Sequence, residues 1–380
     1  MDCVRTPIGR SHEKRGVFRD VRSDDLAAVA VRALLERTRI DPAQVEDVLL
    51  GASQHFGEQG FNVARFVSTV AGLPPETTAA TVNRLCGSGL EAIQQAAHSI
   101  MAGCEDVHIA GGVEHMHHFP IDVGWDVHPK YIERWTPEAL SMGVATDRFA
   151  HKRGITRRAQ DEFALESHRK AAAAQAAGEF RPEIVPVPTT GRNGQTVLVE
   201  QDQCIRPDTS LERLAELQPA FLPPGVGTIT AGNASPLSDG AAAVLIMSEE
   251  KAKALGLRPL VRVVATAIAG VPPTDFPMGP VPATKRVLQR AGMTLADMDL
   301  VELNEAFAAQ VLICLQELDI DPAKLNVRGG SLAIGHPLGA SGARITTTLI
   351  RAMIDRGATL GLATMCVGHG QGIAAIYERV

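Results

Sequence analysis

The sequence predicts an α/β fold built from two copies of one structural plan, with a further segment inserted between them. A helix, a turn and an apolar strand near the start of the chain return in the same order in its second half. In each half, a glycine-rich turn then opens a helix that leads to another strand. The residues between the copies differ in character and include a charge-dense stretch at 151–170. Two repeats of one α/β unit around an insertion are the simplest interpretation.

The first copy begins with an amphipathic helix at residues 24–37, where apolar residues recur at helical spacing behind acidic residues. A turn at Asp41 and Pro42 and an apolar strand at 48–50 follow. The turn 83–89, NRLCGSG, opens a helix at 90–101, which leads to a strand at 107–110. We expect this copy to span residues 1–118 and to be completed by residues 241–254.

An inserted domain is expected at residues 119–240, where it covers one face of the core. Its predicted features are a long helix at 160–177 and a hairpin turn at 191–194, GRNG. The second copy spans residues 255–380 and repeats a helix at 283–291, a turn at 295–299 and a strand at 300–303. The turn that contains His336 opens a helix at 343–356 before a strand at 360–365, and a β segment at 373–380 ends the chain.

Composition is typical of a globular enzyme. The 380 residues are 45% hydrophobic and 21% charged, which predicts about two or three domains with a sizeable interior. A net charge of -6 and only 4% aromatic residues argue against general nucleic-acid binding, which needs a basic face. Neither an export signal nor an apolar run long enough to span a bilayer is found, so we expect a cytoplasmic protein without membrane insertion.

The six cysteines are scattered without a CxxC pair, which disfavours a disulfide framework or a zinc site. Cys104 and Cys314 lie in apolar contexts and are expected to be buried, inert thiols. Cys86 differs because a helix opens directly after it, and the positive end of a helix dipole stabilises thiolate over thiol. Gly87 and Gly89 beside it are expected to remove side chains where a substrate must approach.

Three further groups occupy comparable loops in the second copy. His336, in GHPLGASG, carries an imidazole that can take a proton from a thiol and later stabilise an oxyanion. Cys366 begins the segment CVGHGQG, whose glycines can leave backbone N–H groups exposed to form an oxyanion hole. A strand follows this segment rather than a helix, so it is not a dinucleotide fingerprint. Asn304 follows a strand and can hold a water or a carbonyl oxygen, or cap a turn.

With these segments, the sequence resembles the thiolases over essentially its whole length, and most closely the degradative 3-ketoacyl-CoA thiolases of bacterial fatty-acid β-oxidation. The resemblance is strongest at residues 82–89, 112–116, 231–243, 304–310, 329–342 and 361–380. It implies duplicated α/β halves that form a layered α-β-α-β-α core with an inserted loop domain. It implies an acyltransferase that cleaves 3-ketoacyl-CoA with coenzyme A, yielding acetyl-CoA and an acyl-CoA two carbons shorter through an acyl-cysteine intermediate.

The family's site residues carry over to positions of this chain. Cys86 corresponds to the nucleophile, His336 to the base that activates it, and Cys366 to the proton-transferring acid/base. One oxyanion site would comprise His336 and a water held by Asn304, and the other the backbone N–H groups of Cys86 and Gly368. His369 is an unusual residue in this last loop, at a position that varies among relatives.

The coenzyme A contacts and the partners also follow from the resemblance. Arg206 corresponds to an arginine near the nucleotide phosphates, Phe221 to an aromatic wall of the tunnel, and Ser235 to a serine beside the pantetheine. Pocket-lining positions are matched by Met142, Ala306 and Phe307. Coenzyme A would be a substrate, and no cofactor or metal is implied. The family implies a homodimer or a dimer of dimers, which close relatives join to a hydratase/3-hydroxyacyl-CoA dehydrogenase subunit.

Several alternatives remain at this point. A biosynthetic acetoacetyl-CoA thiolase, which condenses two acetyl-CoA, would use the same catalytic residues. A 3-ketoacyl synthase would use one cysteine and two histidines, and the second thiol, Cys366, argues against it. A catalytically silent acyl-CoA-binding relative would not need all four of Cys86, Asn304, His336 and Cys366. A metal site at His115, His117 and His118 lacks further ligands at suitable spacing apart from Glu114. The chain start, MDCVRTP, leaves few residues for a first strand, which we expect in the middle of the first sheet.

Overall fold

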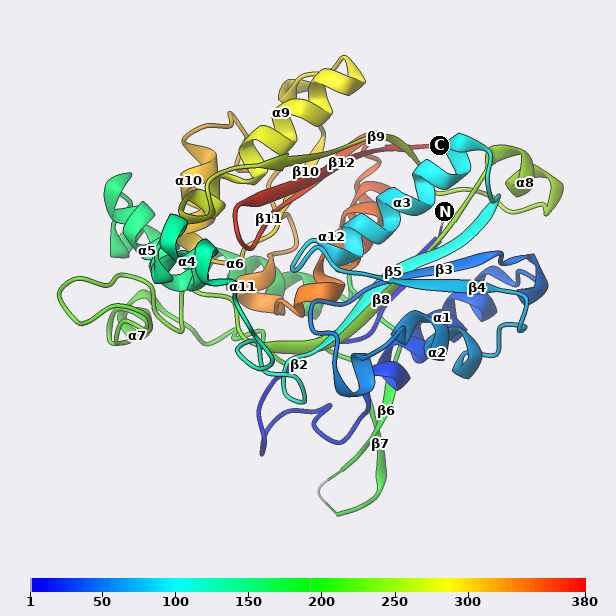
Figure 1. The fold of residues 1–380 in the computed structure, drawn as a ribbon, viewed down its shortest axis with the longest axis horizontal. Helices are drawn as coiled ribbons and strands as arrows, with labels where there is room; N and C mark the ends of the chain where they lie inside the picture. The colour runs from blue at the N-terminus through cyan, green and yellow to red at the C-terminus, as the bar shows by residue number, and fades with distance from the viewer. Residues whose placement is uncertain (1, 192) are drawn as a thin grey trace.

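A computed structural model describes residues 2–191 and 193–380, and two mixed β-sheets form its centre (Figure 1). The first sheet has the strand order β1-β8-β5-β3-β4, with β2 paired to β8. Strand β3 is parallel to both β4 and β5, whereas β8 is antiparallel to β5 and β1. Its strands are β1 (Asp2–Arg5), β2 (Gly9–Arg10), β3 (Asp47–Gly51), β4 (Thr78–Val82), β5 (Val107–His115) and β8 (Ser238–Met247).

The second sheet repeats this topology. Its order is β10-β11-β12-β9, where β10 and β11 are parallel and the other pairs antiparallel. A parallel bridge from Val301 to Leu325 stands where β4 pairs with β3 in the first sheet. The strands are β9 (Val261–Gly270), β10 (Leu300–Leu303), β11 (Leu360–Val367) and β12 (Gln371–Arg379). The predicted duplication is therefore present in the topology of the two sheets.

Helices fill three layers around the sheets (Figure 1). Helices α3 (Ser88–Ala102) and α12 (Leu338–Arg356) lie between the sheets, α1 (Ser23–Thr38) and α2 (Val63–Val70) cover the first sheet, and α9 (Pro280–Ala291) and α10 (Ala308–Leu315) cover the second. Strand β8 shows how both faces are buried. Val244 and Ile246 pack with α3 and α12, while Ala243 and Leu245 pack with α1. This is the expected α-β-α-β-α arrangement.

The two central helices approach so closely that backbone meets backbone. A Cβ atom added to Gly89 would lie 2.8 Å from the carbonyl oxygen of Gly339, and one added to Gly342 would lie 2.3 Å from the nitrogen of Leu90. A Cβ atom on Gly87 would lie 2.7 Å from a methyl group of Val367. The expectation that Gly87 and Gly89 clear space for a substrate is therefore wrong, because they clear space for packing between the two halves.

The segment between β5 and β8 contains most of the remaining elements, which lie beside the core (Figure 1). They are α4 (Pro129–Trp135), α5 (Met142–Lys152), α6 (Arg157–Ala177), β6 (Val187–Thr190), β7 (Thr196–Val199) and α7 (Leu211–Ala215). Strands β6 and β7 form the expected hairpin, part of whose turn, residue 192, lies outside the described residues. Helices α8 (Glu249–Ala254) and α11 (Ser331–Ile334) complete the fold. The proposed limits of the three domains stay a prediction.

Two expectations about single segments are wrong. Strand β1 lies at the edge of the first sheet, not in its middle, because it pairs only with β8 among the described strands. Cys104 is exposed, since it follows Gly103, where α3 ends in a left-handed conformation, whereas Cys314 is buried as expected. Within the described residues, no helix is both long and apolar enough to cross a membrane.

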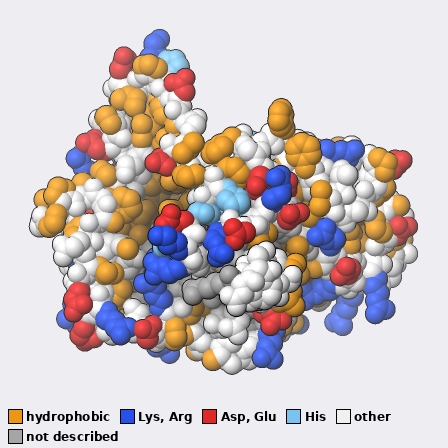
Figure 2. Space-filling view, turned by 90° about the horizontal axis from the view of Figure 1, so that it is seen from below, with side chains coloured by type: hydrophobic (Ala, Val, Ile, Leu, Met, Phe, Trp, Pro, Cys, Tyr) orange, Lys and Arg blue, Asp and Glu red, His pale blue; other side chains and the backbone are white. Residues whose placement is uncertain are grey.

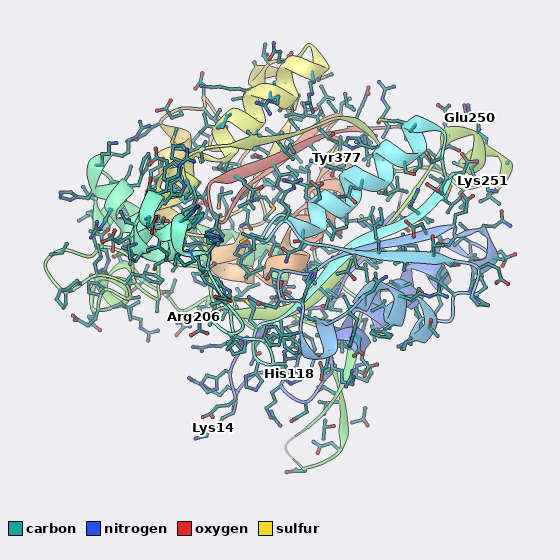
Figure 3. All side chains as sticks on the ribbon, in the orientation of Figure 1. Lys14, His118, Arg206, Glu250, Lys251 and Tyr377 are labelled. Carbon is teal, nitrogen blue, oxygen red and sulfur yellow. The ribbon has the colours of Figure 1, made fainter. Side chains whose placement is uncertain are left out.

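Lys, Arg and His side chains lie together on one face of the molecule (Figure 2). Figure 2 views the molecule from below, and Lys and Arg side chains gather near the middle of this face beside histidines. Figure 3 places Arg206, His118 and Lys14 on this lower side. Arg206, on this side (Figure 3), lines one of the two cavities described below.

Candidate active site

One cavity of about 340 Å³ brings together most of the residues that the sequence singled out. Its wall is largely apolar, and the two thiols and the imidazole open onto it. The predicted residues in this wall are Cys86, Met142, Phe221, Ser235, Ala306, Phe307, His336 and Cys366. Of the other predicted residues, Asn304 and Gly368 contact members of this set, and Arg206 lines a different cavity.

The fold explains why these distant residues meet. Cys86 lies two residues before α3, and His336 lies two residues before α12, so the close crossing of the helices brings both loops together. Cys366 lies near the end of β11, and Asn304 follows the end of the neighbouring strand β10. Ligand chemistry in α/β sheets lies at the carboxyl ends of parallel strands, where both residues stand.

Cys86 is protonated in the resting site. Burial raises the pKa of its thiol to about 11, although backbone N–H groups of Gly368 and of Cys86 itself favour the thiolate. The negative charge of Glu114 adds to the increase in this pKa. Burial is the largest influence on this thiol, so the stabilisation of the thiolate that we expect at the start of α3 does not keep Cys86 ionised at rest.

His336 is neutral and its ring is held at both nitrogens. Burial, and after it the cation of Arg344, lower the imidazole pKa to about 3. Its Nδ1 lies 2.6 Å from Ser341 Oγ, and this hydroxyl donates to the carbonyl of Pro337 at 3.0 Å. Since the hydroxyl proton is used there, Ser341 accepts a hydrogen bond from Nδ1–H. The opposite nitrogen, Nε2, is then free to accept a proton.

A second chain of hydrogen bonds supports this tautomer. Asn304 Nδ2 lies 3.4 Å from His336 Nε2, and Asn304 Oδ1 accepts from Ser331 Oγ at 2.6 Å. Arg344 Nη2 in turn donates to Ser331 Oγ. An amide whose oxygen is occupied by a donor must present its NH₂ group to the imidazole, so Nε2 acts as the acceptor. The buried imidazole is arranged as a base.

Cys366 lies near the end of β11, and Gly368 lies in the turn that joins β11 to β12. Burial raises the pKa of the Cys366 thiol well above its ordinary value, and Cys86 nearby raises it further. The backbone N–H of Gly368 points to the sulfur of Cys86. A Cβ atom on Gly368 would lie 3.3 Å from the sulfur of Met142, which places this glycine against the cavity wall.

Most of the remaining wall comes from the inserted segment and from residues 306–307. The rings of Phe221 and Phe307 meet edge to face, with centroids 5.9 Å apart. Ser235 donates its backbone N–H to the carbonyl of Ala306 at 3.0 Å, which fixes the inserted segment to the second half. Trp125, a residue that the sequence did not single out, also lines this cavity and is 42% exposed.

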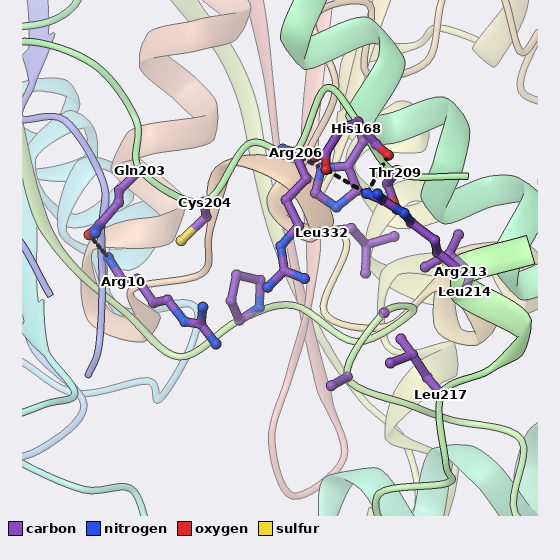
Figure 4. Close-up of a pocket in the computed structure, with 14 residues that line it drawn as sticks. Arg10, His168, Gln203, Cys204, Arg206, Thr209, Arg213, Leu214, Leu217 and Leu332 are labelled. Atoms are coloured by element: carbon purple, nitrogen blue, oxygen red, sulfur yellow. Dashed lines mark hydrogen bonds and ion pairs between the residues drawn. The ribbon is translucent and has the colours of Figure 1, made fainter. Parts of the chain in front are cut away.

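Arg206 lies in a separate cavity of about 210 Å³ on the basic side of the molecule (Figure 4). Arg10 and Arg213 line it too, and the backbone N–H of Arg206 donates to His168 Nδ1 at 3.2 Å. Burial lowers the pKa of His168 to about 4, so that ring is neutral. Pro236 lines both this cavity and the one that contains the thiols, so the two adjoin.

Several residues of the site were missed from the sequence. Glu114 is fully buried and accepts hydrogen bonds from the backbone of Ser53 and Gly339, each at 2.8 Å, which ties the start of α12 to the first half. Ser341 could have been found, since it lies in the first turn of the helix that follows His336. Ser331, Arg344 and Trp125 gave no local signal, because only tertiary contacts bring them to the site.

The histidine segment of the first half is a packed structural feature. The rings of His115 and His118 stack with centroids 3.8 Å apart, and His115 Nε2 lies 3.0 Å from the carbonyl of Phe18. Burial lowers the pKa of His115 to about 4. Among the described residues, no group of three or more His, Cys, Asp or Glu side chains is placed to hold a metal ion.

Comparison with known proteins gives one consistent result. The thiolase N-terminal domain matches residues 1–250, and the thiolase C-terminal domain matches residues 257–379. A 3-ketoacyl-CoA thiolase of Shewanella loihica is 52% identical over 383 residues, covering 100% of this chain and 98% of the relative. Another, from Shewanella frigidimarina, is 51% identical over 384 residues, with coverage of 100% and 98%.

Solved structures agree. Human mitochondrial 3-ketoacyl-CoA thiolase superimposes with a TM-score of 0.91 at 37% identity, covering 100% of this chain and 98% of that one. Acetyl-CoA acetyltransferase of Bacillus anthracis gives a TM-score of 0.91 at 39% identity, with coverage of 100% and 98%. Both halves match, and the reactive loops lie in one cavity. The chain belongs to the thiolase family.

Proposed function

We propose that this protein is a 3-ketoacyl-CoA thiolase of fatty-acid β-oxidation. It cleaves 3-ketoacyl-CoA with coenzyme A, giving acetyl-CoA and an acyl-CoA shortened by two carbons. The observation that carries the proposal is the meeting of two buried thiols and a neutral imidazole in one apolar cavity. Full-length relatives named 3-ketoacyl-CoA thiolases, at 51–52% identity, support the degradative branch. The scheme requires no cofactor, because coenzyme A enters as a substrate.

In the first half-reaction, His336 Nε2 takes the proton of the Cys86 thiol as the sulfur attacks the keto carbon. The bond between the α and β carbons then breaks, and its electron pair moves to the departing acetyl-CoA enolate. Cys366 protonates this enolate at carbon. The products are acetyl-CoA, an acyl group on Cys86, a thiolate at Cys366 and a protonated His336. Splitting the reaction at this covalent intermediate gives ping-pong kinetics.

In the second half-reaction, the Cys366 thiolate takes the proton of coenzyme A. The coenzyme A sulfur attacks the thioester carbon, and the tetrahedral intermediate expels Cys86, which His336 reprotonates. Both thiols are buried and have raised pKa values, so neither is a thiolate in the free enzyme. Cys86 ionises as His336 takes its proton, and Cys366 ionises as it protonates the enolate. Proton transfer is thereby coupled to formation of the new bond.

Two oxyanion sites would serve these steps. The N–H groups of Cys86 and Gly368 favour negative charge at the Cys86 sulfur, and they would also receive the oxygen of the acyl thioester. His336 and a water held by Asn304 would stabilise the enolate oxygen, since Asn304 lies against His336 Nε2. Loss of one such donor typically lowers the rate by about 100-fold or more.

Coenzyme A would lie across both cavities. Arg206, with Arg10 and Arg213, offers guanidinium groups suited to phosphates in the smaller cavity. The pantetheine arm would pass Ser235 and Pro236, where the cavities adjoin, to reach Cys86. Phe221 would border this arm, while Met142, Ala306 and Phe307 would enclose the reacting end.

We also propose a homodimer. Strand β4 lies at the edge of the first sheet, with β3 as its only partner among the described strands, and all five of its residues are partly or fully exposed. Close to it along the chain, Phe61 is 95% exposed and Phe66 is 49% exposed. An open strand edge beside exposed apolar side chains is a surface that a second copy can cover.

A biosynthetic acetoacetyl-CoA thiolase is the second candidate, because the acetyl-CoA acetyltransferase structure superimposes equally well. Rates on 3-ketohexadecanoyl-CoA and acetoacetyl-CoA distinguish the two. We expect efficient cleavage of the long substrate, and strict preference for the four-carbon substrate would favour the alternative.

Mass spectrometry after mixing with 3-ketohexadecanoyl-CoA tests the assigned roles. Cys86→Ala should form no acyl-enzyme, whereas Cys366→Ala should acylate slowly without sustained turnover. Cys104→Ser, which alters an exposed thiol, is the control and should behave as the unmodified protein. Acylation that persists without Cys86 would contradict the assignment.

A further inference from the structure

The turn that supplies Gly368 also carries a side chain that the reaction scheme does not use. His369 stands at its tip with a φ of 59°, a left-handed conformation that is uncommon outside glycine. Its ring is partly buried, and it forms a hydrogen bond and aromatic contacts with residues of the inserted segment. The turn of the catalytic half therefore reaches across to the insertion.

Two aromatic residues contact the imidazole of His369. Tyr131 Oη lies 3.2 Å from His369 Nδ1, and the rings meet edge to face with centroids 5.9 Å apart. The indole of Trp125 lies on the same ring, with centroids 5.8 Å apart. Aromatic pairs in this range attract one another beyond the area that they bury. The three rings form a cluster, hereafter the Trp125–Tyr131–His369 cluster.

The cluster holds a segment that has little else to hold it. Helix α4, which carries Tyr131, has no buried residue, and residues 122–127 are almost all exposed. Further back, Ile121 packs against the core, and its carbonyl accepts a hydrogen bond from Gln54 at 3.3 Å. Beyond that anchor, the contacts with His369 connect the segment to the turn between β11 and β12.

This segment also borders the cavity of the thiols. Ile121 and Trp125 line it together with Cys86 and Cys366. The proposed pantetheine path enters past Pro236. An acyl chain attached at the same thioester therefore needs a different wall, and the apolar side chains of Ile121 and Trp125 supply one.

We propose that His369 is a specificity-determining positioning residue, which, together with Tyr131 on α4, holds Trp125 in the outer wall for long acyl chains. The inference rests on the proposed function. Each methylene of a long chain that contacts this wall leaves water and adds to binding. The acetyl group of acetoacetyl-CoA ends at the reacting carbons and does not reach the wall. Loss of the cluster should therefore weaken selection of long chains and leave the chemistry at Cys86 intact.

The central variant is His369→Asn, because asparagine tolerates the left-handed conformation and removes the ring. We expect kcat/KM for 3-ketohexadecanoyl-CoA to fall about tenfold, as for lost burial of about two methylene groups, through an increase in KM. For acetoacetyl-CoA it should change less than twofold. Tyr131→Phe removes only the hydroxyl. It should lower the ratio of long-chain to short-chain kcat/KM by about threefold, because the variant loses one neutral hydrogen bond.

The two tryptophans of the chain provide a second measurement. Trp125 and Trp135 both lie in this segment, so Trp135→Phe leaves Trp125 as the sole indole reporter and serves as the matched aromatic control on α4. In that background, His369→Asn should increase quenching of Trp125 by acrylamide. Trp135→Phe alone should leave the chain-length ratio unchanged.

The outcomes separate the two proposals. If the unmodified protein cleaves neither substrate, the proposed function fails whatever the variants do. If the unmodified protein cleaves both substrates but His369→Asn lowers the two rates equally, His369 supports the turn between β11 and β12 and does not position the cavity wall. The inference is then wrong. An unchanged ratio together with unchanged quenching would equally overturn it.

Discussion

The hydroxyl of Ser341 offers the sharpest test of how the base is prepared. Its Oγ lies 2.6 Å from His336 Nδ1 and donates to the carbonyl of Pro337 at 3.0 Å, so it accepts the Nδ1 proton. Ser341→Ala removes this acceptor inside a fully buried site. The imidazole must then leave Nδ1–H without a partner or move the proton to Nε2, the atom that takes the proton of Cys86.

The expected loss follows from the cost of the unpaired donor. A buried donor without a partner costs about 1–3 kcal/mol, so the productive tautomer becomes rarer by about 5- to 150-fold. The rate of Cys86 acylation should fall by the same factor, while KM stays nearly constant, because the cavity wall is unchanged. Rapid-quench measurement of acetyl-CoA release in a single turnover reports this step directly.

Thr347→Val is the matched control. Thr347 lies in the same helix, is fully buried, and its hydroxyl donates to the carbonyl of Ala343 at 2.9 Å, four residues back, as that of Ser341 does to Pro337. Both variants lose one such bond, and thermal unfolding should show similar destabilisation. Only Ser341→Ala should slow acylation. Equal acylation rates in the two variants would refute the assigned tautomer.

Two further predictions follow from the buried pair and from the crossing of the helices. The pKa of Cys86 is raised to about 11 and that of His336 is lowered to about 3, so the resting pair is a neutral thiol and a neutral imidazole. The rate at which iodoacetamide alkylates Cys86, followed by mass spectrometry, should therefore rise about tenfold per pH unit from pH 7 to 10, because the thiolate forms only as the pH rises towards the pKa of the thiol. Fast alkylation that does not depend on pH between pH 6 and 8 would instead reveal an ion pair of thiolate and imidazolium. Gly89→Ala should cost about 1–3 kcal/mol of stability through overpacking against α12 and should also reduce kcat by at least tenfold. Gly103→Ala on the same helix meets open space and strains only its left-handed conformation, which costs about 1–2 kcal/mol, so it should lower stability in chemical denaturation but keep full activity.

Local patterns were sufficient to predict the arrangement of the chain. Helical periodicity located α1, and the turns that contain Cys86 and His336 precede the central helices α3 and α12 as expected, although α12 begins at Leu338 and not at residue 343. The repeated order of these signals indicated the duplication. Motif resemblance then singled out Cys86, His336 and Cys366, which the structure places in one cavity.

What could not be predicted depends on contacts between distant segments. Burial raises the pKa of the Cys86 thiol, and burial is a tertiary property that no local motif encodes. Ser331 on α11 donates to Asn304, and Arg344 on α12 donates to Ser331, so this chain of hydrogen bonds joins three segments that are distant in the sequence. The contact between Tyr131 and His369 joins residues 238 positions apart.

The glycine contact between α3 and α12 has a consequence for how such a protein can change. Where backbone touches backbone, the separation of the two loops that carry the sulfur and the imidazole depends on main-chain atoms, which almost every substitution leaves in place. The rim of the cavity is different, because Trp125 and its neighbours come from a segment with few ties to the interior. Substitutions can therefore accumulate at the rim and retune the range of substrates, while the reacting atoms keep a constant geometry. The fold separates the part that breaks the bond from the part that selects the chain.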